Sequence, residues 1–500
     1  MKARWVLAAA FALRLLLIFT YRFDSDEPQH MHVAWGWANG LVQYRDVWDN
    51  HMPLFHLLTA PLFLGGVDDA RLLFAGRLLM LPLFVIDIAL LWLIARKLFD
   101  AKTAKWATVI ASLFPTSFLL SLEYRTDDLW LAFWLAAIAV LLSNIESRRR
   151  SLYAGLLVGG AFAVSMKSTV MLFAIVGAAI ATRRLRRGQA WTPRLHWNFF
   201  AAAAAIPASI FAIFAAAGLW KPMWYDVVIH NIVPFEHAWR GLLFIPLYPI
   251  IRFIALRIED RRRLFVFGCA ALFLLVLVVF WTRLADEDFL PLYPLLALLA
   301  APLLAKRHRF APQLAVAACA LAILFITVPW RDEAHQEIEL VDEVVSITSP
   351  REPVLDLKGE TVFRPRPWYF GLETLTNAHM RLGEIQDTIA GALVRTQTHV
   401  VVTDRLPPRA RRFVDDNYVR WQNLFVAGRE MLGTFRAYEG RRFHVAIAGR
   451  YIVLGGRAFL DGMNADRGVY LAAGDHVFTA RQAVRNPTVI WSGALRNRKR

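Results

Sequence analysis

The sequence has few cysteines and little charge. Its two cysteines, Cys269 and Cys319, both lie in long apolar stretches, so we expect neither a disulfide nor a cysteine metal site. Charged residues make up 19% of the 500 residues, below the value of about a quarter that is typical of soluble domains. Hydrophobic residues make up 57%, and nearly all of the excess lies before residue 330. This balance excludes a soluble, a fibrous and a disordered protein, and it predicts a polytopic α-helical membrane protein with a soluble tail.

Long apolar runs follow one another through the first 329 residues. At a rise of about 1.5 Å per residue, runs such as 264–281 and 310–328 can cross the hydrocarbon core of a bilayer, which is about 30 Å thick. We predict about eleven transmembrane helices, with approximate limits 5–20, 72–95, 104–122, 129–145, 151–166, 168–182, 197–218, 241–256, 264–281, 289–305 and 310–328. The fifth and sixth are short and are joined only by Lys167, so a hairpin that does not fully cross the membrane remains an alternative.

Basic clusters predict the orientation of these helices. Clusters such as Arg148–Arg150 and Arg261–Arg263 occupy every second loop, which is the pattern of short basic loops that stay cytoplasmic. The net charge of +17 therefore indicates a membrane topology and not a nucleic-acid partner. We expect a multi-pass protein of the plasma (inner) membrane. Its predicted outer segments are 21–71, 123–128, 219–240, 283–288 and everything after residue 329.

The composition changes after the last predicted span. Charge rises and prolines become frequent, and the patterns at 337–345 and 398–403 favour a helix and a buried strand. We therefore predict an extracytoplasmic α/β domain over 330–440. Short strands with glycine turns then predict a small β-rich, β-sandwich-like domain over 441–500, behind a transmembrane module over 1–329.

The first outer loop concentrates acidic residues and histidines. Its members are Asp24, Asp26, Glu27, Asp46, Asp49, His30, His32 and His51. Carboxylates grouped at a membrane–water boundary can act as general bases or hold a cation. Composition alone favours a simpler interpretation, which is a solvated acidic loop.

The order of the residues in this loop changes that weighting. An acidic pair, Asp26–Glu27, is followed by Gly40, by Tyr44 and Asp46 in the order Tyr-x-Asp, and by the run His-Met-Pro-Leu at 51–54. This order resembles the first-loop signature of the C-type membrane glycosyltransferases, and most closely their protein O-mannosyltransferase and lipid A aminoarabinose transferase group. A methionine replaces the first proline of that signature. Weaker matches to the same family lie at 123–127, 159–167 and 289–294.

The resemblance implies an inverting transfer of a sugar from a polyprenyl-phosphate donor to a lipid, glycan or protein acceptor on the outer face. A hydroxyl acceptor is a poor nucleophile, so a carboxylate must take its proton, and Asp26 is our candidate for this base. Glu27 is expected to orient Asp26 or to cap the following helix. Asp127 is the second candidate acid, although a purely structural ion pair with Arg125 explains it as well.

Cations on the outer side are candidates for the donor phosphate. We select Arg125, Lys167 and Arg283, because arginine binds phosphate through two parallel hydrogen bonds and lysine binds it as a point charge. For Lys167, snorkelling to the membrane interface is an equally good explanation. The residues expected to support the first loop are Tyr44, Asp46 and His51.

A metal site is not favoured by the sequence. His30, His32 and His51 could combine with Asp26 or Asp46, but the zinc-protease motif HExxH is absent. In the family that the loop resembles, the protein O-mannosyltransferases are regarded as metal-independent, whereas the oligosaccharyltransferases use a divalent cation. We expect no metal and no other cofactor.

Two other functions fit a helical bundle with polar residues. A transporter or flippase of lipid-linked sugars usually has ionisable groups near the membrane midplane and inverted repeats. Here the acidic residues lie at one membrane face and no repeat is evident. A noncatalytic partner protein whose tail binds carbohydrate is the third alternative. Only an enzyme would move label from a polyprenyl-phosphate sugar onto a new acceptor.

Overall fold

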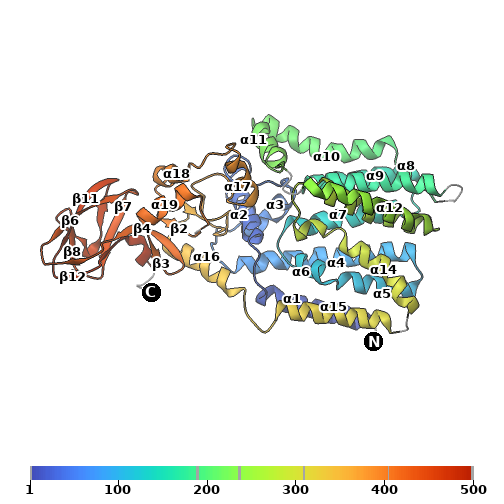
Figure 1. The fold of residues 1–500 in the computed structure, drawn as a ribbon, viewed down its shortest axis with the longest axis horizontal. Helices are drawn as coiled ribbons and strands as arrows, with labels where there is room; N and C mark the ends of the chain where they lie inside the picture. Colours follow the sequence, from blue (N-terminus) through green and yellow to red (C-terminus); the bar gives the residue numbers. More distant parts are fainter. Residues whose placement is uncertain (1–2, 187–190, 235–237, 308–309, 404, 497–500) are drawn as a thin grey trace. The chain divides into compact units, whose positions relative to one another are not determined.

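The computed structural model describes residues 3–186, 191–234, 238–307, 310–403 and 405–496 (Figure 1). The chain divides into two compact units. The first unit comprises Met1–His30, Asn50–Leu62 and Leu72–His335, and the second comprises Met31–Asp49, Phe63–Arg71 and Gln336–Arg500. The predicted first outer loop is therefore shared between the two units.

Helices of the first unit coincide with the predicted spans. They are α1 (Ala3–Thr20), α4 (Leu72–Leu98), α5 (Ala101–Ser112), α6 (Pro115–Leu120), α7 (Thr126–Leu141), α8 (Ser147–Phe162), α9 (Ser168–Leu185), α10 (Trp197–Ala216), α12 (Phe244–Arg257), α13 (Arg261–Phe280), α14 (Tyr293–Arg307) and α15 (Ala311–Thr327). The predicted span 104–122 is divided into α5 and α6. The division falls at Pro115, which cannot donate a helical hydrogen bond and so begins a new helix.

Five of the described helical segments are long and apolar enough to cross a membrane. They are Leu72–Leu98, Ser168–Leu185, Trp197–Ala216, Trp239–Arg257 and Arg261–Phe280. Three shorter apolar segments are Leu54–Phe63, Tyr293–Leu303 and Ala311–Thr327. A helical membrane fold is thus confirmed, whereas the number of eleven crossings stays a prediction.

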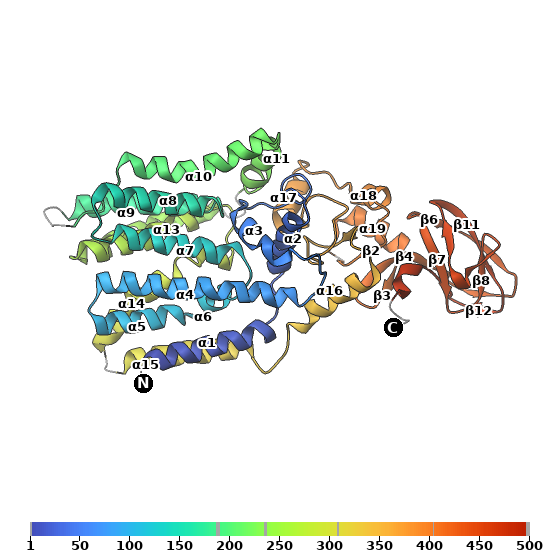
Figure 2. The same ribbon diagram turned by 180° about the vertical axis from the view of Figure 1, so that it is seen from behind.

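Small residues allow the helices of this unit to pack closely. A side chain at Gly155 of α8 would lie 2.3 Å from the carbonyl oxygen of Phe199 in α10, so only glycine fits there. A Cβ atom at Gly268 of α13 would similarly lie 3.0 Å from the Cβ atom of Ala178 in α9. Figures 1 and 2 show α7, α8, α9 and α10 running alongside one another, as this packing requires. Close approach of backbones is the usual basis of helix association in membranes.

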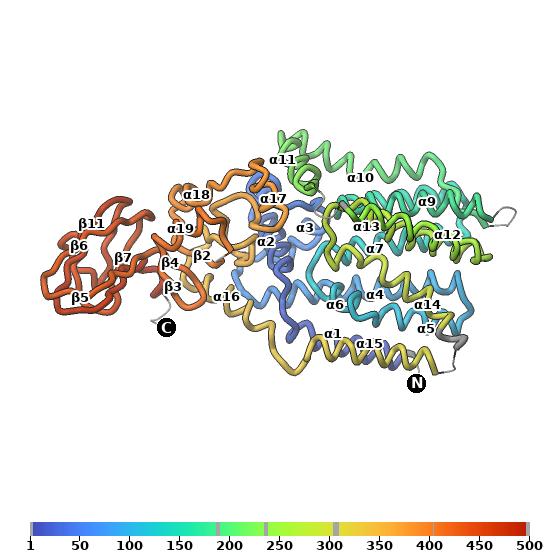
Figure 3. Tube along the Cα trace, in the orientation of Figure 1, coloured from blue at the N-terminus to red at the C-terminus, as the bar shows by residue number. Residues whose placement is uncertain are grey.

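Short elements lie beside the long helices. They are α2 (Asp26–Ala38), α3 (Leu54–Thr59), η1 (Ala60–Phe63), α11 (Trp220–Trp224), η2 (Tyr225–Ile229), η3 (Ala238–Leu243) and η4 (Asp286–Phe289). Helix α2 begins in the first unit and continues past residue 30 into the second (Figure 3).

The second unit contains three β-sheets. Its seven-stranded sheet has the order β1-β2-β4-β13-β7-β10, with β3 also paired to β4. The strands are β1 (Val354–Leu355), β2 (Val400–Val401), β3 (Tyr418–Trp421), β4 (Leu424–Glu430), β7 (Gly449–Leu454), β10 (Val469–Leu471) and β13 (Thr488–Trp491). The first pair, β1 and β2, is parallel, with Val354 opposite Val400.

The smaller sheets and the helices complete this unit. A four-stranded sheet has the order β6-β11-β8-β9, and β12 pairs with β5. These strands are β5 (Thr434–Phe435), β6 (Gly440–Val445), β8 (Ala458–Leu460), β9 (Met463–Asn464), β11 (Gly474–Ala480) and β12 (Val484–Arg485). The helical elements are α16 (His335–Ile347), α17 (Thr374–Arg381), α18 (Ile389–Arg395), α19 (Pro408–Asn417), η5 (Ala465–Arg467) and η6 (Ser492–Leu495).

The seven-stranded sheet takes strands from both sides of residue 440. One hydrophobic cluster also extends from Val344 to Ala494. The predicted α/β and β-rich domains therefore share a core in the structure. The glycine turns after residue 443 do mark a series of short strands, but three of those strands hydrogen-bond into the sheet that begins with β1.

Segments of the first loop pack into the second unit. Ring nitrogen Nδ1 of His32 lies 2.8 Å from the carbonyl oxygen of Val362, and a side chain at Gly359 would collide with His32. The guanidinium of Arg364 donates to Asp68 at 2.5 Å. Residues 31–49 and 63–71 are thus held by hydrogen bonds to the segment that follows β1.

Candidate active site

The predicted acidic pair lies at the start of α2 in the first unit. The backbone N–H of Asp26 donates to Asp24 Oδ1 at 3.0 Å, and the backbone N–H of Asp24 donates to Glu27 Oε1 at 3.0 Å. Acidic side chains are favoured at this end of a helix because its first N–H groups have no helical partner. The local sequence therefore fixes the conformation around Asp26.

Glu27 connects the first loop to two other segments. Its carboxylate accepts hydrogen bonds from Arg77 Nη2 and Nε, at 2.6 and 2.8 Å, and from the backbone N–H of Tyr124 at 3.0 Å. The Glu27 and Arg77 side chains are both completely buried. Arg77 further donates to the carbonyl oxygens at the end of α1, including that of Tyr21 at 2.7 Å. Glu27 thus serves as a buried link between the first loop, α4 and the turn at 123–125.

Arg125 stands at the centre of a cluster of carboxylates. It lies just before α7, and its side chain is 7% exposed. Five acidic side chains reach its guanidinium, namely Asp26 at 2.7 Å, Glu287 at 3.1 Å, Asp24 at 3.2 Å, and Asp127 and Glu123 at 3.4 Å. Three segments that are distant in sequence therefore meet at one arginine.

Lys167 extends this cluster through Asp127. Its Nζ atom lies 2.7 Å from Asp288 Oδ1 and 3.4 Å from Asp127 Oδ1. The same ammonium group is 6.0 Å from the centre of the Trp130 ring. Because Asp127 also contacts Arg125, a chain of alternating charges runs from Asp26 through Arg125 and Asp127 to Lys167. The expected contact between Asp127 and Arg125 is present, and it is part of this larger network.

The side chains in this chain of charges differ in their exposure to solvent. The side chain of Asp26 is 26% exposed and that of Lys167 is 18% exposed, whereas Asp127 is only 5% exposed. A bound molecule would therefore meet Asp26 and Lys167 before Asp127. Asp127, between the two cations, is better placed to hold them than to contact an acceptor.

The surrounding charges keep the two cations protonated. Burial alone lowers the pKa of Lys167, but the carboxylates of Asp127 and Asp288 outweigh it and raise the pKa above its ordinary value. Arg125 shows the same balance, because Asp26 and Asp127 raise its pKa against the effect of burial. Burial raises the pKa of Glu123 well above its usual range, and Arg125 only partly opposes this shift. The cluster therefore retains two full positive charges.

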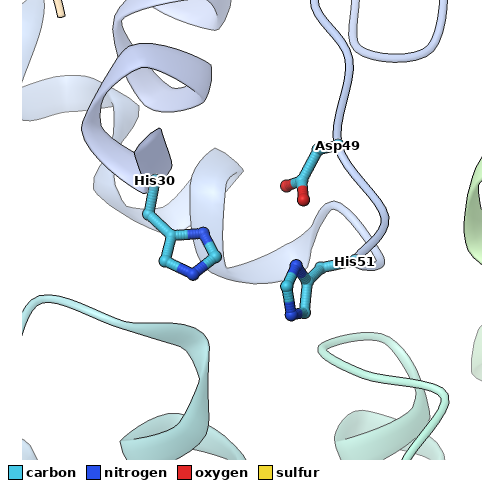
Figure 4. A group of neighbouring side chains, drawn as sticks. All are labelled: His30, Asp49 and His51. Atoms are coloured by element: carbon cyan, nitrogen blue, oxygen red, sulfur yellow. The ribbon is translucent and has the colours of Figure 1, made fainter. Parts of the chain in front are cut away.

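A group of histidines lies next to the acidic pair. One ring nitrogen of His30 is 3.0 Å from Nε2 of His56, and the rings of His30 and His51 are 5.0 Å apart between centroids. Figure 4 shows the rings of His30 and His51, and the third side chain drawn there, Asp49, is assigned to the second unit. Burial, followed by the nearby His51 and His56, lowers the pKa of His30 well below its ordinary value. His30 is therefore a neutral ligand or hydrogen-bonding group.

The suggested metal ligands divide between the two units. His30, His51 and Asp26 belong to the first unit, whereas His32 and Asp46 belong to the second. Asp46 already accepts from Arg45 at 2.7 Å, and His32 is bonded to Val362. The expectation of no metal stays a prediction.

The remaining predicted residues have varied positions. Arg283 lies exposed in the turn before η4. Tyr44 is buried in the second unit with a φ of 70°, and its N–H donates to the carbonyl oxygen of Val47. Burial raises the pKa of Asp127, but Lys167, Arg125 and then His51 in the first unit outweigh burial and lower this pKa below its ordinary value. The roles assigned to these residues stay predictions.

Sequence reasoning missed several members of the cluster. Glu287 and Asp288 lie in η4, within the predicted outer segment 283–288. Arg283 is the only residue of that segment that the sequence analysis proposes for the site. Arg77 was not selected either, although an arginine at the start of an apolar span signals a buried partner. An acidic run, Asp-Glu-Asp at 286–288, was the available signal for the third segment of the site.

Comparisons with known proteins show what this chain is similar to. Residues 54–221 match the family model described as dolichyl-phosphate-mannose-protein mannosyltransferase. The structure of ArnT from Cupriavidus metallidurans bound to undecaprenyl phosphate is similar, with a TM-score of 0.59 and 12% identity over 85% of this chain and 97% of that one. Its apo structure gives a TM-score of 0.58 with the same identity and coverage. No curated protein matches the chain by sequence.

Proposed function

We propose that the chain is a C-type membrane glycosyltransferase of the mannosyltransferase-like and ArnT-like group, and that it transfers a sugar from a polyprenyl-phosphate donor to an acceptor. In this proposal the reaction takes place on the extracytoplasmic face of the plasma (inner) membrane. The acceptor is a lipid, a glycan or a protein, and the anomeric carbon is inverted. The C-terminal region, after residue 329, lies on the same side.

The observation that carries this proposal is the chain of charges from Asp26 to Lys167. Asp26 is its partly exposed acidic end, so Asp26 would take the proton from the acceptor hydroxyl as the glycosidic bond to phosphate breaks. Arg125, at 2.7 Å from Asp26, would keep this carboxylate ionised and fixed in position. Asp127 would act one step away, by holding Arg125 and Lys167.

Lys167 is the best candidate for the departing phosphate. Negative charge grows on the phosphate oxygens as the bond breaks, and a fixed cation stabilises it most where water is scarce. Lys167 is partly exposed, whereas the guanidinium of Arg125 is surrounded by five carboxylates. We therefore propose that Lys167 contacts phosphate and that Arg125 mainly organises the acids. Arg283 would assist from the exposed turn before η4.

The proposed transfer needs no divalent cation. Lys167 and Arg125 already lie between the carboxylates, so a metal ion placed there would face two like charges within a few ångströms. Addition of EDTA to the purified protein should leave the transfer rate unchanged. A rate that falls with EDTA and returns with Mg²⁺ or Mn²⁺ would contradict this part of the proposal.

A transfer assay with radiolabelled polyprenyl-phosphate sugars tests the function. We expect the reconstituted protein to move label onto an acceptor, and Asp26→Asn to lower kcat by about 10²–10⁴-fold, because the base is lost. Asp69→Asn is the matched control, since Asp69 pairs only locally with Arg71 on the exposed surface. Thermal unfolding of both variants should resemble that of the original protein.

Two results would contradict the proposal. Activity of Asp26→Asn within a few-fold of the original protein would remove Asp26 as the base. Movement of intact lipid-linked sugar between leaflets, without label on any acceptor, would instead establish the transporter or flippase alternative.

A further inference from the structure

A basic cleft lies in the second unit, among residues that the transfer chemistry does not use. It is formed by the end of β4 and the following residues on one side and by β6 on the other, with a volume of about 460 Å³. Small-molecule sites usually occupy about 300–1,000 Å³. Three arginines line it, namely Arg429, Arg441 and Arg442. The cleft is thus large enough for a short oligosaccharide and is rich in anion-binding groups.

One of these arginines is held in place by its neighbours. Arg441 donates to the carbonyl oxygen of Leu432 at 2.5 Å, and its guanidinium lies 4.4 Å from the centre of the buried Phe435 ring. A guanidinium that is already ordered loses little freedom when it binds an anion. Arg429 and Arg442 are exposed at the same cleft. The site therefore combines one fixed and two accessible guanidinium groups.

The wider segment is biased towards arginine. Residues 441–500 contain ten Arg and one Lys but only three Asp and no Glu. At the cleft, Asp475 is paired with His444 at 2.9 Å, and Glu430 is the other acidic lining residue. Arginine binds carboxylate and phosphate groups through two parallel hydrogen bonds, which lysine does not.

The shape and floor of the cleft favour a glycan over a membrane surface. Apolar side chains, Met431 and Phe443, lie beside the arginines. A sugar presents apolar C–H faces and polar edges, and it fits such a mixed lining. A lipid surface is broad and flat, so it would contact protruding cations better than a cleft. In addition, β6 is an edge strand of its sheet, so the backbone N–H and C=O groups on its outer side point away from β11 and are not paired with it.

We propose that this cleft binds an anionic oligosaccharide that carries carboxylate or phosphate groups. Arg429 and Arg442 would form ion pairs with the charged groups of this ligand. Arg441, whose guanidinium is already held in place, would also bind one of them. If the protein is the glycosyltransferase proposed above, this ligand is the acceptor glycan, and that identification rests on the proposed function. Binding itself does not depend on Asp26 or Lys167.

Equilibrium binding to the purified full-length protein tests the proposal. The probes are fluorescent tetragalacturonate, a phosphorylated mannose oligosaccharide and neutral maltotetraose. We expect at least one charged probe to bind, the neutral probe to bind at least about tenfold more weakly, and Arg429→Gln combined with Arg442→Gln to raise the Kd of the charged probe by about tenfold. The relative affinity of the two charged probes identifies carboxylate or phosphate as the recognised group.

Controls separate this site from its surroundings and from catalysis. Arg467→Gln removes an exposed arginine outside the cleft and should leave the Kd unchanged. Asp26→Asn should bind the probe as the original protein does, whatever its effect on transfer. Arg442→Glu is a second cleft variant at an exposed position, and it should weaken binding further than Arg442→Gln while its thermal unfolding stays like that of the original protein.

Several outcomes would overturn the proposal. They are equal binding of neutral and charged probes, unchanged binding by both the double variant and Arg442→Glu, or equal weakening by Arg467→Gln. Binding to phosphatidylglycerol vesicles that depends on Arg429 and Arg442, without binding of either charged glycan, would show that the cleft meets lipid instead.

Discussion

Around Arg125 and Lys167 of the first unit, each cation contacts two or more carboxylates and is largely shielded from water. In residues 441–500 of the second unit, by contrast, arginines greatly outnumber acids, and those at the cleft, such as Arg442, are exposed. Buried charges must be paired because desolvation is costly, whereas exposed charges remain available to a ligand. Burial and pairing of charges, and not their number, therefore distinguish a preorganised reaction site from a binding surface.

The largest expected effect comes from breaking a fully buried pair. Replacing Arg77 with Met would leave the Glu27 carboxylate buried without its partner, at a cost of about 3–5 kcal/mol of folding free energy. Thermal unfolding of the detergent-solubilised protein measures this as a lower midpoint. Combining Arg77→Met with Glu27→Gln should recover part of the loss. An unchanged midpoint in the single variant would show that the pair does not support the fold.

A buried arginine in the second unit sharpens the comparison. Arg364 is almost completely buried and donates to Asp68 and to Thr348 Oγ1 at 2.7 Å. Arg364→Gln should cost about 2–3 kcal/mol, because the Asp68 carboxylate and several buried oxygen atoms lose their donor. The exposed Arg442→Gln should leave the midpoint unchanged. If both variants melted alike, burial would not be the property that separates the two kinds of arginine.

Lys167 tests the partly exposed end of the charge chain. Lys167→Ala should lower kcat/KM for the polyprenyl-phosphate donor by about 10–100-fold, which corresponds to about 1.4–2.7 kcal/mol of transition-state stabilisation. Lys167→Arg keeps a cation between Asp127 and Asp288 and should retain more activity. Steady-state kinetics with varied donor measures both. Unchanged donor KM and kcat in Lys167→Ala would leave Lys167 with only a structural role, in its ion pairs with Asp127 and Asp288.

The smallest effect concerns pH and the histidines beside the site. Burial, then His51 and His56, lowers the pKa of His30, while Asp26 opposes this shift and Arg125 adds to it. The unfolded chain therefore binds a proton below about pH 6.5 that the folded protein does not, so stability falls as pH drops, by up to about 1.4 kcal/mol per pH unit.

A variant isolates the contribution of His30 to that slope. The unfolding midpoint of the original protein should fall between pH 7.5 and pH 5.5, and the fall should be smaller in His30→Asn. Identical pH slopes in the two proteins would show that the other titratable groups of the cluster account for the effect.

Much of the fold follows from local sequence. Apolar runs of about twenty residues identify membrane helices wherever they occur, because the bilayer imposes its own length, and the helices of the first unit lie at the predicted places. The predicted helix at 337–345 lies within α16, and the strand at 398–403 contains β2. The shared core of the second unit was not predicted, because strand pairing between distant segments leaves no local pattern.

For the site, the order of the amino acids sets which residue types occur and at which end of the predicted helices they lie. It identified Asp26, Asp127, Arg125 and Lys167 from the loop signature and from the scarcity of outer cations. That these four form one chain of charges, and that η4 adds Glu287 and Asp288, depends on how the helices pack. The reason is physical. Hydrophobic length and helix capping act over neighbouring residues, whereas an ion pair forms only where helix packing brings distant turns within about 4 Å of each other.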